Sequence, residues 1–302
     1  MVGSEYIKKA AAEAGFDMCG IVRCRPLVEE EPRFRQWLEA GYAAGLYYLE
    51  RNMDKRFDPA RLVEGAKSVI VCAVGYKNRF SDGYPADCRT KVASYACNRD
   101  YHTTIKGMLR RLLDALRERS PEIEGRVFTD SAPLLEKRLA IDAGLGWRGR
   151  QSLLVTPRYG SFVLIGEIVI NEEVDRYDTP LDVAGCGECR RCVDACPNGA
   201  IQDGRYIDAA RCISCATVEG RAADGTDLHG WIFGCDECQS CCPYNIRAPY
   251  YRSDGFAPLF DPLAISREEW LATDEEMFRT KFKDTPLMRS GAERIKRNIE
   301  RG

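Results

Sequence analysis

Four regularly spaced cysteines are the residues of this chain best suited to chemistry. In "CGECRRCVDACPNGAI", residues 186–201, they stand at gaps of two, two and three, and a proline follows the last of them. The spacing C-x2-C-x2-C-x3-C-P is typical of thiolates that hold 4Fe-4S clusters, where three bind one cluster and the fourth binds a second. Such a run needs a partner run elsewhere in the chain.

The partner run is "GCDECQSCCPYN", residues 234–245, which has its own cysteine pair at a gap of two and its own Cys-Pro junction. If the cysteine of that junction crosses over, one cluster is held by Cys186, Cys189, Cys192 and Cys242. The other cluster then has Cys196, Cys235 and Cys238 and lacks one thiolate. Between the runs, "RCISC" offers either Cys212 or Cys215 as the missing ligand.

Two other chemistries also use clustered cysteines. Zinc ribbons carry two C-x2-C pairs, but zinc gives no reason for four cysteines at fixed gaps or for two Cys-Pro junctions. Radical chemistry with S-adenosylmethionine uses C-x3-C-x2-C, and here Gly199 occupies the position of the third cysteine. We therefore expect two iron-sulfur clusters.

Composition places these cysteines in a globular, reducing context. The 302 residues are 45% hydrophobic and 30% charged, which suits packed domains, and the net charge of -2 means that a polyanionic partner must meet a local basic patch. The first residues, "MVGSEYIKKAAAEAGF", read as an amphipathic helix without a signal-peptide apolar run. No stretch reaches the roughly 20 apolar residues of a membrane span. We expect a cytoplasmic protein with no membrane association and with reduced thiols.

The elements that position the cysteines and their partners suggest three regions. Up to about residue 175, buried-strand runs such as "KSVIVCAVGY" and "SFVLIGEIVIN" flank a helical pattern with apolar residues from Ile105 to Leu116. Ten of the fifteen cysteines lie between 186 and 242, where hydrophobic periodicity fades. We predict an α+β protein: an α/β domain over 1–175, a ferredoxin-like domain with two 4Fe-4S clusters over 176–250, and a short helical, basic tail over 251–302.

The first region contains one candidate acid. In "RVFTDSAPLLEK", a strand ends at Val127 and Phe128, and Asp130 stands where the chain turns into a helix. It is either the N-cap of that helix or a functional acid. Downstream, "GLGWRG" matches G-x-G-x-x-G but follows a helix rather than a strand, so Gly144 is predicted to end that helix instead of binding a dinucleotide.

A second polar group, "NRDYH" at residues 98–102, precedes the long helical pattern. It either gathers functional groups, with Arg99, Asp100, Tyr101 and His102 close together, or is local structure in which Asp100 caps that helix and His102 lies in its first turn.

The order of these motifs resembles that of the epoxyqueuosine reductases over nearly the whole chain. The resemblance is carried by "TDSAPLLEKRLAIDAGLGWRGRQSLLV", "GSFVLIGEI", "CGECRRCVDACPNGAI", "RCISCATVE" and "IFGCDECQSCCPYN", with "KRFDPARLVEGAKSVI" and "YACNRDYH" upstream. Members of that family reduce epoxyqueuosine to queuosine in the tRNA anticodon loop, using cobalamin and two 4Fe-4S clusters.

The resemblance implies roles for particular residues. Asp130 matches the proton donor, and the second cluster's ligands become Cys196, Cys212, Cys235 and Cys238. Cobalamin is expected in a pocket that includes Arg56, Arg99, Tyr101, Asp130 and Ser214, and the electrons would come from an external low-potential donor.

Two departures from the family pattern matter. Cys215 stands where an aromatic residue is usual, so a spare thiol is expected near the second cluster. Many members also continue into a C-terminal helical-repeat domain, whereas this sequence stops at Gly302. We therefore expect the basic tail from Arg279 to Arg301, with eight Lys or Arg against three acids, to help hold tRNA.

Two alternatives belong to other functional classes. A reductive dehalogenase-like enzyme would use the same cofactors on small molecules, although such enzymes commonly begin with a twin-arginine signal. A non-enzymatic ferredoxin-type electron carrier would leave Asp130 and the first region without a task.

Overall fold

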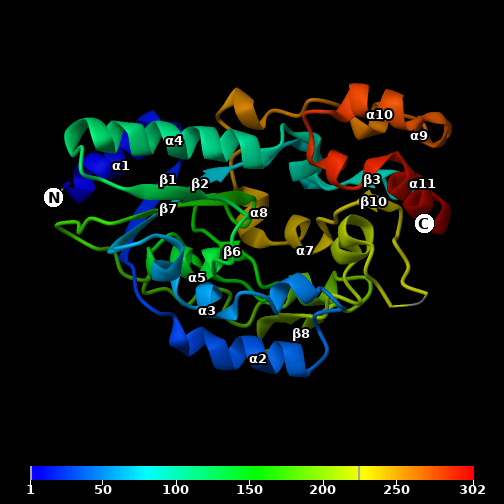
Figure 1. Ribbon diagram of the computed structural model, residues 1–302. Helices are drawn as coiled ribbons and strands as arrows, with labels where there is room; N and C mark the ends of the chain where they lie inside the picture. Colours follow the sequence, from blue (N-terminus) through cyan, green and yellow to red (C-terminus); the bar gives the residue numbers. More distant parts are fainter. Residues whose placement is uncertain (1, 224) are drawn as a thin grey trace.

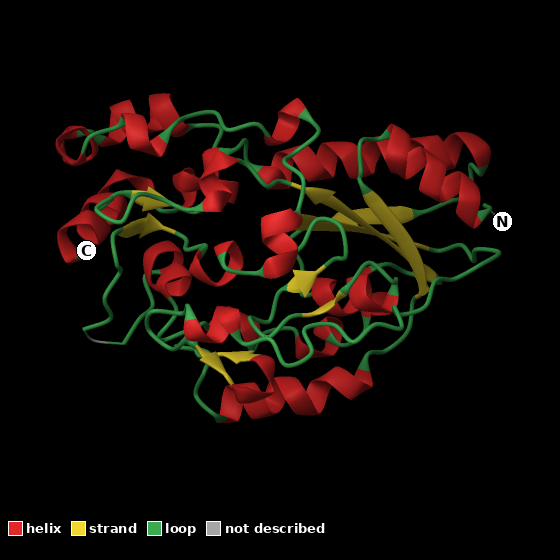
Figure 2. Ribbon diagram, turned by 180° about the vertical axis from the view of Figure 1, so that it is seen from behind, coloured by secondary structure: helices red, strands yellow, loops and turns green. Residues whose placement is uncertain are grey.

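An antiparallel four-stranded sheet organises the N-terminal part of the protein. The computed structural model describes residues 2–223 and 225–302. The strand order is β1 (Met18–Arg23), β2 (Ser68–Gly75), β7 (Val163–Ile170) and β4 (Gly125–Phe128), and every neighbouring pair is antiparallel. In Figure 1 the sheet lies between two helical layers, and Figure 2 shows its twisted strands from behind.

Helices cover both faces of this sheet. Two helices, α1 (Ser4–Glu13) and α4 (Tyr101–Arg119), pack on one face. The apolar residues of α4 between Ile105 and Leu116 are buried at the predicted helical spacing. On the other face packs α5 (Glu136–Asp142), through Leu139 and Ala140. Gly144 follows α5 at φ 71°, so the prediction that it ends this helix is confirmed.

The predicted α+β class is confirmed, but the α/β assignment of the N-terminal domain is wrong, because its sheet contains only antiparallel pairs. The error has a physical cause. Every residue of β2 is buried, since helices cover both sides, and a doubly covered antiparallel strand gives the same continuous apolar run as a parallel one. Burial is visible in the sequence, whereas strand direction is not.

The C-terminal helices build a second core against the first region. They are α9 (Arg267–Ala272), α10 (Glu275–Phe282) and α11 (Gly291–Arg301). Their aromatic residues Trp270, Phe278 and Phe282 pack with a two-stranded parallel sheet of β3 (Lys91–Val92) and β10 (Trp231–Phe233). The predicted helical tail is thus present, and it is docked on the molecule.

The remaining elements are short and frame the cysteine-rich segment. Near the bottom of Figure 1 lie α2 (Glu31–Glu39) and the pair β8 (Ile201–Gln202) and β9 (Tyr206–Ile207), with α3 (Met53–Arg56) above α2. The hairpin of β5 (Trp147–Arg148) and β6 (Leu154–Val155) lies nearer the middle of the view. Within the segment stand α6 (Arg191–Asp194), α7 (Glu237–Ser240) and α8 (Pro243–Arg247). No helix among the described residues is long and apolar enough to span a membrane.

Candidate active site

A cavity of about 790 Å³ lies beneath the sheet, between the N-terminal region and the cysteine-rich segment. Its lining comes from α2, from α3, from residues 130–138, from the β5–β6 hairpin and from β9. Glu219 and Arg289 contribute from the C-terminal half of the chain. The two halves of the protein therefore build this cavity jointly.

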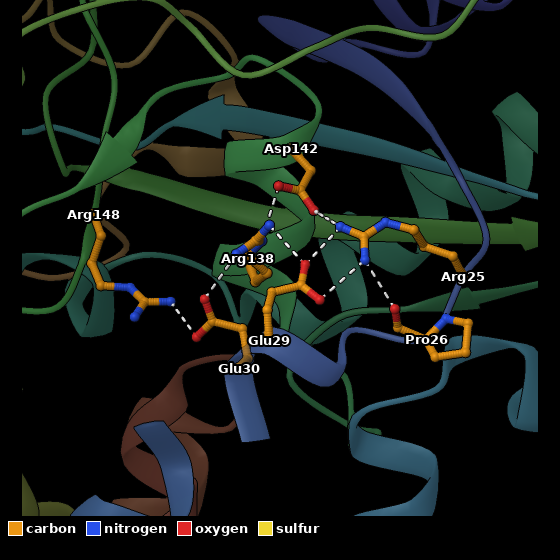
Figure 3. A network of polar contacts seen from close by, with 7 residues as sticks. All are labelled: Arg25, Pro26, Glu29, Glu30, Arg138, Asp142 and Arg148. Carbon is orange, nitrogen blue, oxygen red and sulfur yellow. Dashed lines mark hydrogen bonds and ion pairs between the residues drawn. The ribbon is translucent and has the colours of Figure 1, made fainter. Parts of the chain in front are cut away.

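Arginine ion pairs fix one wall of the cavity (Figure 3). Arg138 of α5 binds Glu30 at 3.0 Å, Glu29 at 2.9 Å and Asp142 at 2.9 Å. Glu30 also accepts a hydrogen bond from Arg148 of β5 at 2.8 Å. Burial opposes the charge of Glu30, but these two arginines outweigh it and lower its pKa. The network ties α5 to the residues before α2 and to the β5–β6 hairpin.

Asp130 lies on the cavity in an unusual backbone conformation. Its φ is 45°, in the left-handed region that residues other than glycine seldom adopt. The preceding Thr129 donates its hydroxyl to the Ile165 carbonyl oxygen of β7 at 2.8 Å. The backbone N–H of Asp130 donates to Glu136 Oε1 at 2.5 Å. Helix α5 starts only at Glu136 with Leu135 as its N-cap, so the N-cap interpretation of Asp130 is wrong.

The carboxylate of Asp130 is held from α4. Tyr101 Oη donates to Asp130 Oδ2 at 2.6 Å, and His102 Nε2 lies 3.7 Å from the same oxygen. Desolvation opposes ionisation of Asp130, but its interactions with His102 and Tyr101 prevail and lower its pKa. The side chain remains 56% exposed. In this state Asp130 is a carboxylate that faces the cavity.

His102 stands between two acids. Its Nδ1 is 2.8 Å from Asp100 Oδ1, and Asp100 also caps α4 by accepting the His102 backbone N–H at 2.8 Å, so the cap, one of the two interpretations of this segment, is present. Interactions with Asp100 first, and with Asp130 second, raise the pKa of His102 to about 9. The imidazole is therefore protonated at neutral pH, beside the ionised Asp130.

Two further acids act on Asp130 or are acted on by it, and the first of them, Glu136, also lines the cavity. Burial and the charge of Asp130 raise the pKa of Glu136 to about 7. Glu167 of β7 is 0% exposed, and among the described residues neither of its carboxyl oxygens has a hydrogen-bond partner. Burial and the charges of Glu136 and Asp130 raise the pKa of Glu167 well above its usual value, so it is protonated.

Two polar groups on the cavity wall lack partners. Within the described chain, no group bonds the buried Nε of Arg56 or the buried Nε2 of Gln151, and both residues line the cavity. Burial lowers the pKa of Arg56, whose guanidinium lies 5.3 Å from the ring centroid of Phe34. Buried donors of this kind cost free energy until an acceptor is supplied. They suit a ligand rich in amide or phosphate oxygens.

The cysteine runs form two groups. Burial raises the pKa of Cys192, and the neighbouring Cys186, Cys242 and Cys189 raise it further. Arg150 holds the loop that carries this group, donating to the Cys189 carbonyl oxygen at 2.7 Å.

The second group surrounds Cys238. Burial raises its pKa well above the usual value, and Cys235, Cys212 and Cys196 add to the rise. Cys215 has Cys212 and Glu219 as its charged neighbours, and its pKa is raised mainly by burial, to about 12. The structure thus brings Cys212 into the second group.

The thiols are spread out. Within the described part of the chain, no three His, Cys, Asp or Glu side chains surround a common point as the ligands of a single ion do. In a cubane, by contrast, each thiolate binds a separate iron.

Comparisons with known proteins place this architecture in a family. A family model described as epoxyqueuosine reductase QueG, DUF1730, matches residues 56–131, and one described as a 4Fe-4S double cluster binding domain matches residues 185–245. An epoxyqueuosine reductase of Cyclobacterium marinum is 40% identical in an alignment that covers 98% of this chain and 95% of the relative. The chain belongs to the epoxyqueuosine reductase family.

Solved structures of epoxyqueuosine reductases share the fold. A crystal structure with an epoxyqueuosine-modified tyrosine tRNA stem loop aligns with TM-score 0.86 at 27% identity, over 98% of this chain and 79% of the other. The Bacillus subtilis enzyme, solved with its catalytic aspartate loop swung out of the active site, aligns equally well. The catabolic reductive dehalogenase NpRdhA aligns with TM-score 0.50 at 16% identity, over 96% of this chain and 35% of that one, a likeness of fold alone.

This member of the epoxyqueuosine reductase family gathers only some of the residues expected at the cofactor pocket. Arg56 and Asp130 line the cavity, and Tyr101 reaches it through its hydrogen bond to Asp130. Arg99 is outside the cavity lining and lies 3.9 Å from Asp284 in an exposed ion pair. Ser214 is outside it too, and begins the π-helical turn Cys215–Glu219.

Sequence reasoning missed the acids Glu136 and Glu167. Glu167 carried a usable signal, because it is the one charged residue in the buried-strand run "SFVLIGEIVIN". Glu136 carried none, since an acid in the first turn of a helix is ordinary.

Proposed function

We propose that this protein reduces epoxyqueuosine to queuosine in the anticodon loop of tRNA, with cobalamin in the cavity and electrons delivered through two 4Fe-4S clusters. The observation that carries the proposal is one cavity of about 790 Å³ whose lining brings Asp130 together with the unpartnered donors of Arg56 and Gln151. The curated relatives named for this activity, and the neighbour solved with a modified tRNA stem loop, support the substrate.

The cavity residues fit cobalamin. The unpartnered donors Arg56 Nε and Gln151 Nε2 match the amide and phosphate oxygens around a corrin. Lys137 also lines the cavity, and burial lowers its pKa. Reduced cobalt would supply a nucleophile stronger than any protein side chain.

The cysteine groups fit two clusters. Cys186, Cys189, Cys192 and Cys242 would hold one, and Cys196, Cys212, Cys235 and Cys238 the other. Within each group the neighbouring thiols raise the pKa of one member, Cys192 in the first and Cys238 in the second, and a bound cationic iron core would offset the repulsion between the thiolates. The clusters would carry electrons one at a time from an external low-potential donor.

Asp130 is the proposed proton donor. Removing an epoxide oxygen to leave an alkene takes two electrons and two protons, and the oxygen departs as water. With the cavity open, Asp130 is ionised and the nearby proton resides on His102, 3.7 Å away. A cofactor and a nucleotide would bury Asp130 further, which raises a carboxyl pKa and favours a protonated Asp130. Tyr101 would keep the carboxyl aimed at the cavity.

The function is tested by anaerobic reconstitution with iron, sulfide and cobalamin, followed by incubation with tRNA that carries epoxyqueuosine and a chemical reductant. Mass analysis of the nucleosides should show queuosine forming only when both cofactors and the reductant are present. Conversion that does not depend on cobalamin would overturn the proposal.

Replacing Asp130 tests the acid. Asp130→Asn removes the ionisable proton but preserves the size of the side chain, so turnover should fall by about 100-fold or more. Iron content and the cobalamin absorption spectrum should match those of the wild type, because Asn can still accept the Tyr101 hydrogen bond. Wild-type turnover in this variant would remove Asp130 from the role of proton donor.

A further inference from the structure

The backbone of Asp130 needs support from its surroundings. At φ 45° Asp130 lies in the left-handed region, which residues other than glycine seldom adopt, although Asp and Asn do so more often than most. Such a conformation persists only where neighbouring contacts determine it. The contacts to the carboxylate from Tyr101 and His102 orient the side chain and leave the main chain unrestrained.

The side chain of Glu136 holds the main chain of Asp130. Glu136 Oε1 accepts the Asp130 N–H at 2.5 Å, across a loop of five residues. On the other side, Thr129 is anchored to β7 through the Ile165 carbonyl oxygen. The left-handed residue is thus clamped between a strand and a helix terminus, and Glu136 provides the helix side.

Glu136 is itself held in place. It is the first residue of α5, and two residues later Arg138 makes three ion pairs that fix this helix to the cavity wall (Figure 3). Glu167 lies behind it, on the face of β7 that α5 covers, with Ile165 and Val169 on either side in the same core. The charged groups that act on Glu136 are Asp130, Lys137 and His102, while Glu167 is protonated.

We propose that Glu136 is a positioning residue for Asp130: its side chain latches the Asp130 backbone N–H and keeps the carboxyl turned into the cavity. This inference rests on the proposed function only for its effect on turnover. The latch itself is a property of the protein without cofactors. A loop released from Glu136 would leave the left-handed conformation and carry the Asp130 carboxyl away from Tyr101.

The test compares three replacements by hydrogen exchange and kinetics. Glu136→Ala removes the acceptor of the Asp130 amide, so that amide should exchange at least about tenfold faster in the cofactor-free protein. In the reconstituted enzyme kcat should fall by about tenfold to a hundredfold, the usual effect of misplacing a catalytic group by an ångström. The KM for tRNA should stay within about twofold, because Glu136 acts through Asp130 rather than on substrate.

Conservative variants separate a latch from a general structural role. Glu136→Gln keeps an acceptor oxygen at the same reach and should restore slow exchange and most of kcat. Glu136→Asp keeps the charge, but its side chain is one methylene shorter and its oxygen does not reach the Asp130 N–H. We expect Glu136→Asp to behave like Glu136→Ala, and it serves as the test variant if Glu136→Ala does not fold. Exposed Glu118 of α4 provides the matched control, and Glu118→Ala should leave both readouts unchanged.

Two outcomes would overturn the latch. One is native exchange and native kcat in Glu136→Ala. The other is equal impairment of Glu136→Gln and Glu136→Ala, which would make the acidity of Glu136, not its acceptor oxygen, the property that matters. If the wild type fails to reduce epoxyqueuosine, the proposed function fails, but the exchange measurement still decides the latch.

Discussion

At the scale of single residues, His102 controls the charge next to the proposed acid. It is flanked by Asp100 on one nitrogen and Asp130 on the other, and its pKa is raised to about 9. A histidine whose pKa is higher in the folded than in the unfolded protein stabilises the fold. This stabilisation is complete below the pKa of the unfolded state, about 6.5, and is lost as the pH rises through the pKa of the folded state. The proton beside Asp130 should therefore disappear between about pH 8 and pH 10.

This predicts an alkaline limit on activity. Turnover of the wild type should fall above about pH 9, approaching a tenfold loss per pH unit, because the Asp130 site loses its proton reservoir. His102→Gln should be slower at neutral pH and should lack the inflection near 9. A pH profile of kcat over pH 6.5–10.5 measures both effects, with Lys106→Gln on the next turn of α4 as a control. An inflection that persists in His102→Gln would assign it to another group.

At the scale of elements, the turn after Ile213 separates the two candidates for the fourth ligand of the second proposed cluster. The chain forms a π-helical turn over Cys215–Glu219 in which Cys215 is buried. Cys235, Cys212 and Cys196 all add to the rise in the pKa of Cys238. We therefore propose Cys212 as the fourth ligand.

Single replacements should separate the two thiols. Cys212→Ala should lower the iron bound per chain to about half, because one of two clusters loses a ligand. Cys215→Ala should keep the wild-type iron content and its visible absorption. Iron and sulfide analysis of anaerobically reconstituted protein provides the measurement. The opposite result would exchange the roles of the two cysteines.

The elements also show what could be predicted from sequence. The buried strands β2 and β7 and the apolar face of α4 follow directly from hydrophobic periodicity. Periodicity does not predict that Asp130, Glu136 and Glu167 lie close together. Their proximity depends on how α5 packs against β7 and on an antiparallel strand pairing that periodicity cannot reveal. The cysteine runs were readable because a cluster imposes spacing on the sequence itself.

At the scale of the whole molecule, the C-terminal tail is part of the body of the protein. Helix α11 buries Ile295 and Ile299 in the second core, and Arg294 donates to the Val218 carbonyl oxygen. Just before it, Arg289 pairs with Glu219 and lines the cavity. The basic tail thus reaches the proposed active site at Arg289 and continues onto the outer surface, where Arg297 and Arg301 are exposed.

This arrangement predicts that α11 contributes phosphate contacts to tRNA binding. Arg297 and Arg301 lie one helical turn apart, so they point to the same side and can meet neighbouring phosphates. Replacing both by Gln should weaken tRNA binding at low salt and reduce the slope of log K against log salt by about 1.4–1.8, since each lost contact removes about 0.7–0.9. Binding titrations at several salt concentrations measure this slope. Helix α1 lies at the opposite end of the molecule from α11 in Figure 1 and contacts α4. Lys9 of α1 and Arg119, the last residue of α4, are exposed, and their replacement by Gln changes the net charge equally. An equal loss of slope in that control pair would mean that tRNA responds to total charge, and α11 would then hold no defined phosphate contact.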